Sequence, residues 1–242
     1  MILPAIMGAT ARRFDPDTVL LLPMTGANNS TTFTDIARGG NAPHTVTPNG
    51  DAKISTAVAD PFSVSGGVGT FDGSGDYLSI PANPDHYLNS GGNTFECWCR
   101  FASGARTELR GLFCRYLDDS NWLLVYYHTN SGLGIYYKNS SATAYFIEQG
   151  SVTGWVDQTW YHVAVSSADG KTWRVYRDGT QLGAGTLAKT PPDMSATTTT
   201  IAKGGQGAIV AYKDFHGQMS DVCITRRAKY TANFTPPARL KP

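Results

Sequence analysis

The stretch Gly154–Gly183, GWVDQTWYHVAVSSADGKTWRVYRDGTQLG, predicts two strands joined by a tight turn. Apolar residues alternate along Trp160–Ser166 and again along Thr172–Arg177. This two-residue period is typical of strands with one buried face. Residues 168–171 (ADGK) form the turn, because Asp hydrogen-bonds its own backbone and Gly accepts positive φ. A second Asp-Gly pair at 178–179 starts another hairpin, so the stretch predicts an antiparallel meander.

The same alternation continues outside the meander. Thr94–Phe101 (TFECWCRF) directs Phe95, Cys97, Cys99 and Phe101 to one face, which we expect to be core. Trp160 and Val163 are expected to support the meander from opposite faces, with Trp160 as a buried residue. Short strands at close spacing, with no helical pattern of ten residues, predict an all-β sandwich. We expect a single domain over residues 17–235, followed by a C-terminal tail at 236–242.

Several runs of sequence carry a family resemblance. They are, in chain order, Phe71–Gly73 with Asp76–Leu78, Thr94–Trp98, Trp160–Ala164 with Tyr176–Gly179, and Gly217–Val222. Together they resemble laminin-G-like domains of the concanavalin-A-like lectin and glucanase superfamily. The resemblance implies an antiparallel two-sheet jelly-roll sandwich. The ending Lys229–Pro237 (KYTANFTPP) resembles the ending of such domains in tailed-phage virion proteins.

Charge and cysteine usage limit the setting. The formal net charge is +1, which gives no electrostatic reason to expect nucleic acid or a membrane surface as a partner. The four cysteines are expected to be free thiols packed in the core, which suits a reducing cytoplasm. Met1–Met7 is too short and too interrupted by proline for a signal peptide, and no run reaches transmembrane length. We therefore expect synthesis in a host cytoplasm.

Residues 1–16 predict an extended N-terminal arm, because they have apolar residues but no sustained period. Such an arm is expected to dock on a partner or on a neighbouring copy. With the phage-like ending, it predicts a structural protein at the virion surface, either a capsid decoration or a tail-associated adhesin. The expected partners are other capsid or tail proteins, copies of the chain itself and host-surface glycans. A free-standing carbohydrate-binding module is the alternative.

No catalytic pattern is present in the sequence. Glycosidases of this fold need two carboxylates across a cleft, whereas Trp98 and Arg100 occupy the positions two and four residues after Glu96. The five histidines are scattered. We therefore expect a non-enzyme. A glycoside hydrolase or lyase is the less favoured alternative, because a catalytic cleft assembled from residues far apart in the sequence would leave no short motif.

Two sets of site residues are predicted. For a glycan site we select Trp98 and Trp122 as stacking aromatics, with Asp118 and Asn121 as hydrogen-bonding groups at a loop mouth. Related domains often bind calcium through carboxylate and carbonyl oxygens, which calcium prefers. By this resemblance, Asp35 and Asp221 are the expected calcium ligands.

Overall fold

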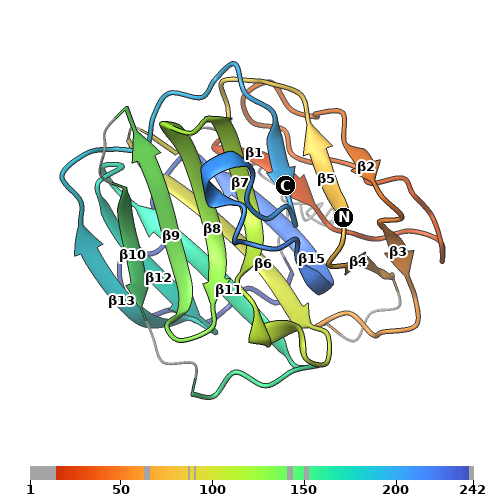
Figure 1. The fold of residues 1–242 in the computed structure, drawn as a ribbon. Coiled ribbons are helices and arrows are strands. Elements are labelled where there is room, and N and C mark those ends of the chain that lie inside the picture. Colours follow the sequence, from red (N-terminus) through yellow and green to blue (C-terminus); the bar gives the residue numbers. More distant parts are fainter. Residues whose placement is uncertain are drawn as a thin grey trace, which may run out of the picture.

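The computed structural model is a sandwich of two antiparallel sheets, which confirms the predicted all-β jelly-roll fold (Figure 1). The structure describes residues 15–239 with the exception of 63–65, 87, 90, 141–143 and 150–152. The expected N-terminal arm, residues 1–16, therefore lies outside the described residues except for its last two. Within the described part, the only helical segments are the short turns η1 (Ala105–Thr107) and η2 (Gly207–Ile209), and no helix is long and apolar enough to cross a membrane.

Sheet A has eight strands. In spatial order they are β13 (Thr180–Thr186), β12 (Thr172–Arg177), β11 (Trp160–Ser167), β6 (Asn93–Phe101), β15 (His216–Thr225), β4 (Val68–Asp72) and β3 (Lys53–Ser55), with β1 (Thr18–Leu22) also paired to β15. β1 pairs antiparallel with the closing strand β15, which brings the two ends of the domain together.

Sheet B has seven strands and faces sheet A. In spatial order they are β10 (Tyr145–Gln149), β9 (Gly132–Asn139), β8 (Asn121–His128), β7 (Arg110–Asp118), β14 (Thr199–Ile201), β5 (Tyr77–Ile80) and β2 (Thr47–Asn49). The four strands β7 to β10 are joined as successive hairpins, and β14 inserts between β7 and β5 from a distant part of the sequence.

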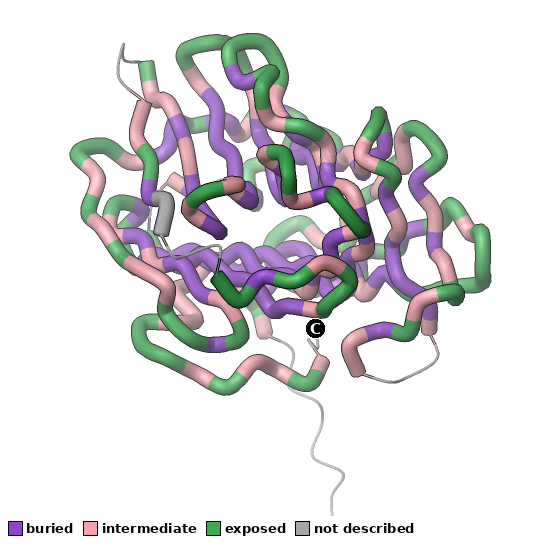
Figure 2. Tube along the Cα trace, turned by 60° about the horizontal axis from the view of Figure 1, so that its bottom comes forward, coloured by how far each residue is buried: buried purple, intermediate pink, exposed green. Residues whose placement is uncertain are grey.

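The core lies between the two sheets. The predicted inward face of β6 is confirmed, since Phe95, Cys97, Cys99 and Phe101 are each at most 1% exposed. Phe95 meets Phe113 of β7 across the sandwich, with ring centroids 5.2 Å apart. All four cysteines are free and buried, as expected. In Figure 2 the buried residues follow the strands of both layers, and the exposed residues follow the turns and connecting loops.

The central meander forms as predicted, with one correction. β11 pairs with β12 and β12 with β13, and Val163 lies in the core. Trp160 does not. It lies on the outer face of sheet A, is partly exposed, and donates its indole N–H to the Ala59 carbonyl (3.0 Å). The buried tryptophan of the meander is Trp173, which is 0% exposed and packs in the core.

The segment after β15, residues 226–239, runs over the outer face of sheet A, and we refer to it as the C-terminal strap. Tyr230 and Phe234 stack on each other with ring centroids 3.5 Å apart and an interplanar angle of 6°. Phe234 also contacts the rings of His162 and Tyr176, and its amide donates to the Gly179 carbonyl (2.9 Å). The strap therefore covers β11 and β12 with a second apolar layer.

A buried carboxylate anchors the strap to the sheet. Glu96 is 0% exposed and accepts hydrogen bonds from Tyr230 Oη (2.6 Å) and from Lys229 Nζ, and its Oε2 lies 3.2 Å from His162 Nε2. Burial by itself would raise the pKa of Glu96, but the hydrogen bond with His162 and the charge of Lys229 outweigh it and lower that pKa to about 2. Glu96 therefore holds the strap as a carboxylate.

Candidate functional site

The outer face of sheet B carries a second apolar cluster beneath a loop. Residues 203–213, here called the crossing loop, connect β14 to the segment before β15 and pass in front of β7 and β8 (Figure 1). Ile209 of this loop is 3% exposed, and it packs with Trp122, Leu124 and Tyr126 of β8. Tyr212 meets the Tyr126 ring edge-on, with centroids 4.9 Å apart.

Beside the crossing loop, the outer face of sheet B is hollowed. The cavity has a volume of about 510 Å³. It is lined by Tyr77, Ser79, Tyr116, Leu117, Ala196, Thr197, Thr198, Thr200 and Gln206. We refer to it as the hydroxyl-lined hollow, because six of these nine residues carry a hydroxyl group.

Strand alternation explains why these side chains meet. Leu78 and Ile80 of β5 point into the core, so the intervening residues Tyr77 and Ser79 face outward. β14 places Thr200 opposite Ser79, and the Thr200 hydroxyl donates to the Cys114 carbonyl (2.9 Å). The floor of the hollow is therefore regular sheet, and the 196–198 segment and Gln206 add to its walls from loops.

Two interactions fix the walls. Tyr116 donates its phenolic O–H to Asp119, which also accepts from the Ala208 amide (2.8 Å). This pairing raises the pKa of Tyr116 and lowers the pKa of Asp119, so the proton stays on the phenol. Across the hollow, the Lys203 ammonium lies 4.6 Å from the centroid of the Tyr77 ring and 3.1 Å from Asp214 Oδ2.

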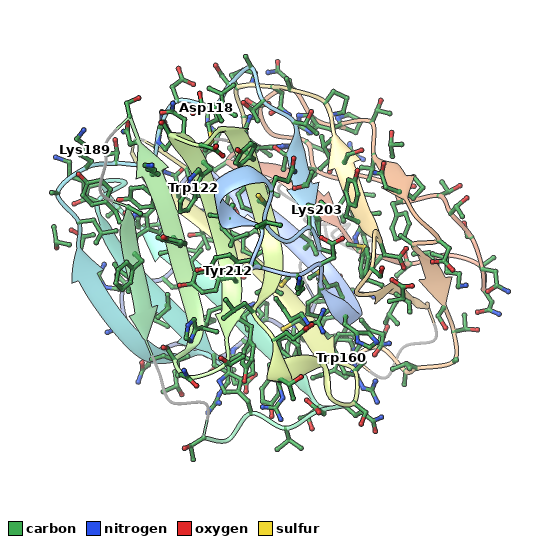
Figure 3. All side chains as sticks on the ribbon, in the orientation of Figure 1. Asp118, Trp122, Trp160, Lys189, Lys203 and Tyr212 are labelled. Atoms are coloured by element: carbon green, nitrogen blue, oxygen red, sulfur yellow. The ribbon has the colours of Figure 1, made fainter. Side chains whose placement is uncertain are left out.

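The structure separates the residues that we selected for a glycan site. Asp118, Asn121 and Trp122 lie together at the β7–β8 turn, where Asn121 Nδ2 donates to Asp118 Oδ1 (3.1 Å). Trp98 lies instead on sheet A, where its ring meets Phe62 at 5.6 Å. Trp122 is only 2% exposed, so its ring is covered and offers no stacking surface to a sugar. Figure 3 shows Asp118, Trp122 and Tyr212 along the same part of sheet B.

The two predicted calcium ligands already have protein partners. Asp35 is 4% exposed and accepts from the amides of Leu21 and Ala37 (both 3.0 Å), and its Oδ2 lies 2.9 Å from His44 Nδ1. Burial tends to raise its pKa, but these hydrogen bonds outweigh it and lower the pKa. Asp221 is 0% exposed, and its Oδ1 lies 3.7 Å from Arg239 Nε.

Among the described residues, the carboxylates that do converge are Asp51, Asp72 and Asp76, each with an oxygen within 4.8 Å of the others. Asp76 is buried and accepts from the amides of Asp51 (2.8 Å) and Asp72 (3.0 Å). Burial, together with the charge of Asp72, raises the pKa of Asp76 despite these hydrogen bonds. Three carboxylates at this spacing could supply oxygen ligands to a divalent cation.

Sequence reasoning missed the hydroxyl-lined hollow. Its residues come from four separate parts of the chain, β5, β7, β14 and the crossing loop, and no short motif joins them. The available signal was the alternation in β5 and β14, which directs Tyr77 and Thr200 away from the core.

Comparison with known proteins gives a family match and a set of similar folds. The sequence model of the concanavalin A-like lectin/glucanases superfamily matches residues 72–232. No curated protein sequence matches the chain. One similar solved structure is domain 4 of AbnA, a GH43 extracellular arabinanase from Geobacillus stearothermophilus, in complex with arabinotriose. It has 16% identity and a TM-score of 0.61, and the match covers 88% of this chain and 93% of that one.

Two further similar structures are toxin domains. The binding domain of Paraclostridial Mosquitocidal Protein 1 has 10% identity and a TM-score of 0.63, with 88% of this chain and 50% of that chain covered. The binding domain of botulinum neurotoxin DC in complex with SialylT has 13% identity and a TM-score of 0.60, with coverages of 88% and 49%. The chain thus spans about half the length of these toxin binding domains. At these identities the likeness shows a shared fold.

Proposed function

Because the chain belongs to the concanavalin A-like lectin/glucanase superfamily, we propose that it is a non-enzymatic carbohydrate-binding domain whose ligand occupies the hydroxyl-lined hollow. The observation that carries this proposal is the hollow itself. Its volume of about 510 Å³ lies within the usual range of ligand sites, roughly 300–1,000 Å³.

The lining of the hollow suits a sugar. Sugars present both apolar C–H faces and many hydroxyl groups, so a site for them needs ring surfaces beside hydrogen-bonding groups. Tyr77 and Tyr116 supply aromatic surface with a polar tip, which is the usual contribution of tyrosine at binding surfaces. Gln206 supplies an amide that can both donate and accept. The hydroxyl oxygens of Ser79 and Thr200 can accept, since their hydrogens are donated to the carbonyls of Thr47 (3.4 Å) and Cys114 (2.9 Å).

Binding without hydrolysis fits this lining better than catalysis does. Hydrolysis of a glycosidic bond commonly needs two carboxyl groups about 5–10 Å apart on either side of the bond. The described residues that line the hollow include no carboxyl and no imidazole group. Glu96, the most completely buried glutamate in the described part of the chain, lies on the other sheet and serves the C-terminal strap.

A glycan array followed by titration calorimetry on the best ligand tests the proposal. Tyr77→Ala should weaken binding at least tenfold, because it removes ring surface from the wall of the hollow. The matched control is Phe146→Ala on β10, which removes an aromatic ring that is 55% exposed on the same sheet but outside the hollow. Equal loss in both variants, or loss only in Phe146→Ala, would place the ligand elsewhere.

We further propose that the domain is displayed on the particle of a tailed phage. The support is the resemblance of the ending Lys229–Pro237 to the endings of such virion domains. The test is co-sedimentation with particles that lack the protein, comparing the full chain with a chain that lacks residues 1–16. Incorporation of the full chain alone would assign attachment to the arm. Failure of both chains to sediment would contradict the virion role and leave the free carbohydrate-binding module.

Calcium is the cofactor that we propose, with the group Asp51, Asp72 and Asp76 as its ligands. Oxygen ligands and flexible coordination are what this cation accepts. Gly73, Ser74 and Gly75 form the bend that joins Asp72 to Asp76.

A further inference from the structure

We propose that the hydroxyl-lined hollow receives the end of an uncharged glycan chain, and neither the interior of a polysaccharide nor an acidic sugar. This inference rests on the proposed carbohydrate-binding function and specifies the ligand of the same site. It follows from two features of the described residues: the crossing loop and the charges around the hollow.

The crossing loop closes one side of the hollow. An open sheet face would offer a chain a path across all the strands, from β5 through β14 and β7 to β8 and β9. Here Ile209 and Tyr212 fill that path, because they pack directly on the outer side chains of β8. Gln206, from the same loop, forms part of the wall. A polysaccharide therefore has an entrance to the hollow but no exit along the sheet.

The loop is fastened at both ends and in the middle, so it is a fixed wall. Gly204 N donates to Asp214 Oδ1 (2.8 Å), and Ala208 N donates to Asp119 Oδ1 (2.8 Å). Lys213 exchanges backbone hydrogen bonds with the start of β7 and the residue before it, accepting from Gly111 N (2.9 Å) and donating to Leu109 O (2.8 Å). With Ile209 buried beneath it, the loop has little freedom to swing away and let a chain pass.

Charges around the hollow disfavour an acidic ligand. The described lining contains no charged side chain. Lys203, the cation beside Tyr77, is already paired with Asp214. Asp118 and Asp119 follow Leu117 at the rim, and both are exposed. A carboxylate on the ligand would meet these two negative groups, although the charge of Lys138 partly offsets that of Asp119.

One further cation, Arg115, lies behind the wall. It is 1% exposed, and its Nη2 donates to the carbonyl oxygens of Thr197 (2.6 Å) and Met194. Because the 194–197 segment covers the guanidinium, a ligand in the hollow cannot form an ion pair with it. Arg115 positions this segment and adds no anion site.

Two series of probes test chain-end recognition and charge. The first is neutral oligosaccharides of arabinose, galactose and glucose, one to six units long, titrated calorimetrically. Affinity should rise to two or three units and then stay level, because later units lie outside the hollow. The second is matched pairs that differ by an acidic group, such as lactose with sialyllactose. The neutral member should bind at least fivefold more tightly.

Variants connect both results to the hollow. Asp118→Asn should reduce the ratio of the affinity for the neutral ligand to that for its acidic partner by about two- to threefold. The reason is that it removes one negative charge from the rim, at a position partly screened by solvent. Gln206→Ala should weaken every neutral ligand, while Gln181→Ala, an exposed glutamine on β13 of the other sheet, should leave affinity unchanged.

The outcomes separate this inference from the proposed function. Affinity that keeps rising through six units would overturn chain-end recognition while keeping carbohydrate binding. An acidic member that binds as well as its neutral partner would overturn the charge argument in the same way. Binding of no member of either series, with the folded state verified by circular dichroism, would contradict the proposed function itself.

Discussion

Acid should destabilise the protein through one buried imidazole. His86 is 0% exposed and lies between Thr199, whose hydroxyl is 3.2 Å from Nδ1, and the ring of His44, with centroids 4.4 Å apart. Burial, followed by the charges of His44 and Arg115, lowers the pKa of His86 to about 3. Asp35 acts in the opposite direction but does not offset these effects.

The sign and size of the effect follow from proton linkage. In the unfolded chain an imidazole has a pKa of about 6.5, so acid protonates the unfolded state first and favours it. The stabilising contribution of neutral His86 is complete above pH 6.5 and is lost as the pH falls towards 3. The loss is about 1.4 kcal/mol for each pH unit in this window. At pH 5 this amounts to about 2 kcal/mol, or roughly 4–8 °C in Tm for a chain of this size.

The assay is urea unfolding at pH 7.5, 6.5, 5.5 and 5.0, comparing the parent with His86→Gln, which retains hydrogen-bonding groups near Thr199. The variant should be less stable at pH 7.5 but should lose less stability on acidification. Glu96 does not contribute to the pH dependence in this window. Because its pKa is lowered to about 2 in the folded state, the stability that it provides is lost only below about pH 4.5. Parallel pH profiles of parent and variant would refute the assignment to His86.

Three other outcomes are expected. Trp173→Ala should lower the unfolding free energy by about 3–5 kcal/mol, because Trp173 is fully buried. Trp160→Ala should lower it by only about 1 kcal/mol, because Trp160 is partly exposed. Similar urea midpoints for the two variants would contradict these placements. Tyr230→Phe should cost about 1–3 kcal/mol in thermal unfolding, because buried Glu96 loses a donor, and an unchanged Tm would show that the strap does not depend on it. Calcium should raise the Tm of the parent by mass action, and Asp76→Asn should abolish this rise. If calcium instead still raised the Tm of Asp76→Asn but not that of Asp221→Asn, the result would favour Asp221, the ligand predicted from sequence.

The strands were predictable from sequence because their signal is local. Thr172–Arg177 occurs as a strand with the bounds expected from alternation and turn residues. The inward residues of β6 followed from the same two-residue period. Local period could not show that the outer face of β11 is only partly covered. Trp160 was therefore expected to be buried, while the structure leaves it partly exposed.

The binding surface was less predictable, because tertiary contacts decide which outward aromatics remain available. Trp122 was selected from sequence as an available stacking aromatic, yet Ile209, almost ninety residues later in the chain, packs against it. Conversely, Tyr77 and Tyr116 become neighbours in one hollow only because β14 inserts between their strands. A single sequence carries no signal for these pairings.

The C-terminal strap determines how the domain can be held in an experiment. At the end of the strap, Arg239 contacts Asp60 (3.4 Å) and the ring of Phe62 over the outer face of sheet A. At the start of the described chain, Asp15 pairs with Arg227 of the strap. The hollow lies on the opposite sheet. A biosensor chip or bead coupled close to Arg239 or Asp15 would therefore hold sheet A against the support and turn the hollow towards the solution. Random coupling through surface lysines would instead attach some molecules through Lys203, next to Tyr77, and block the hollow.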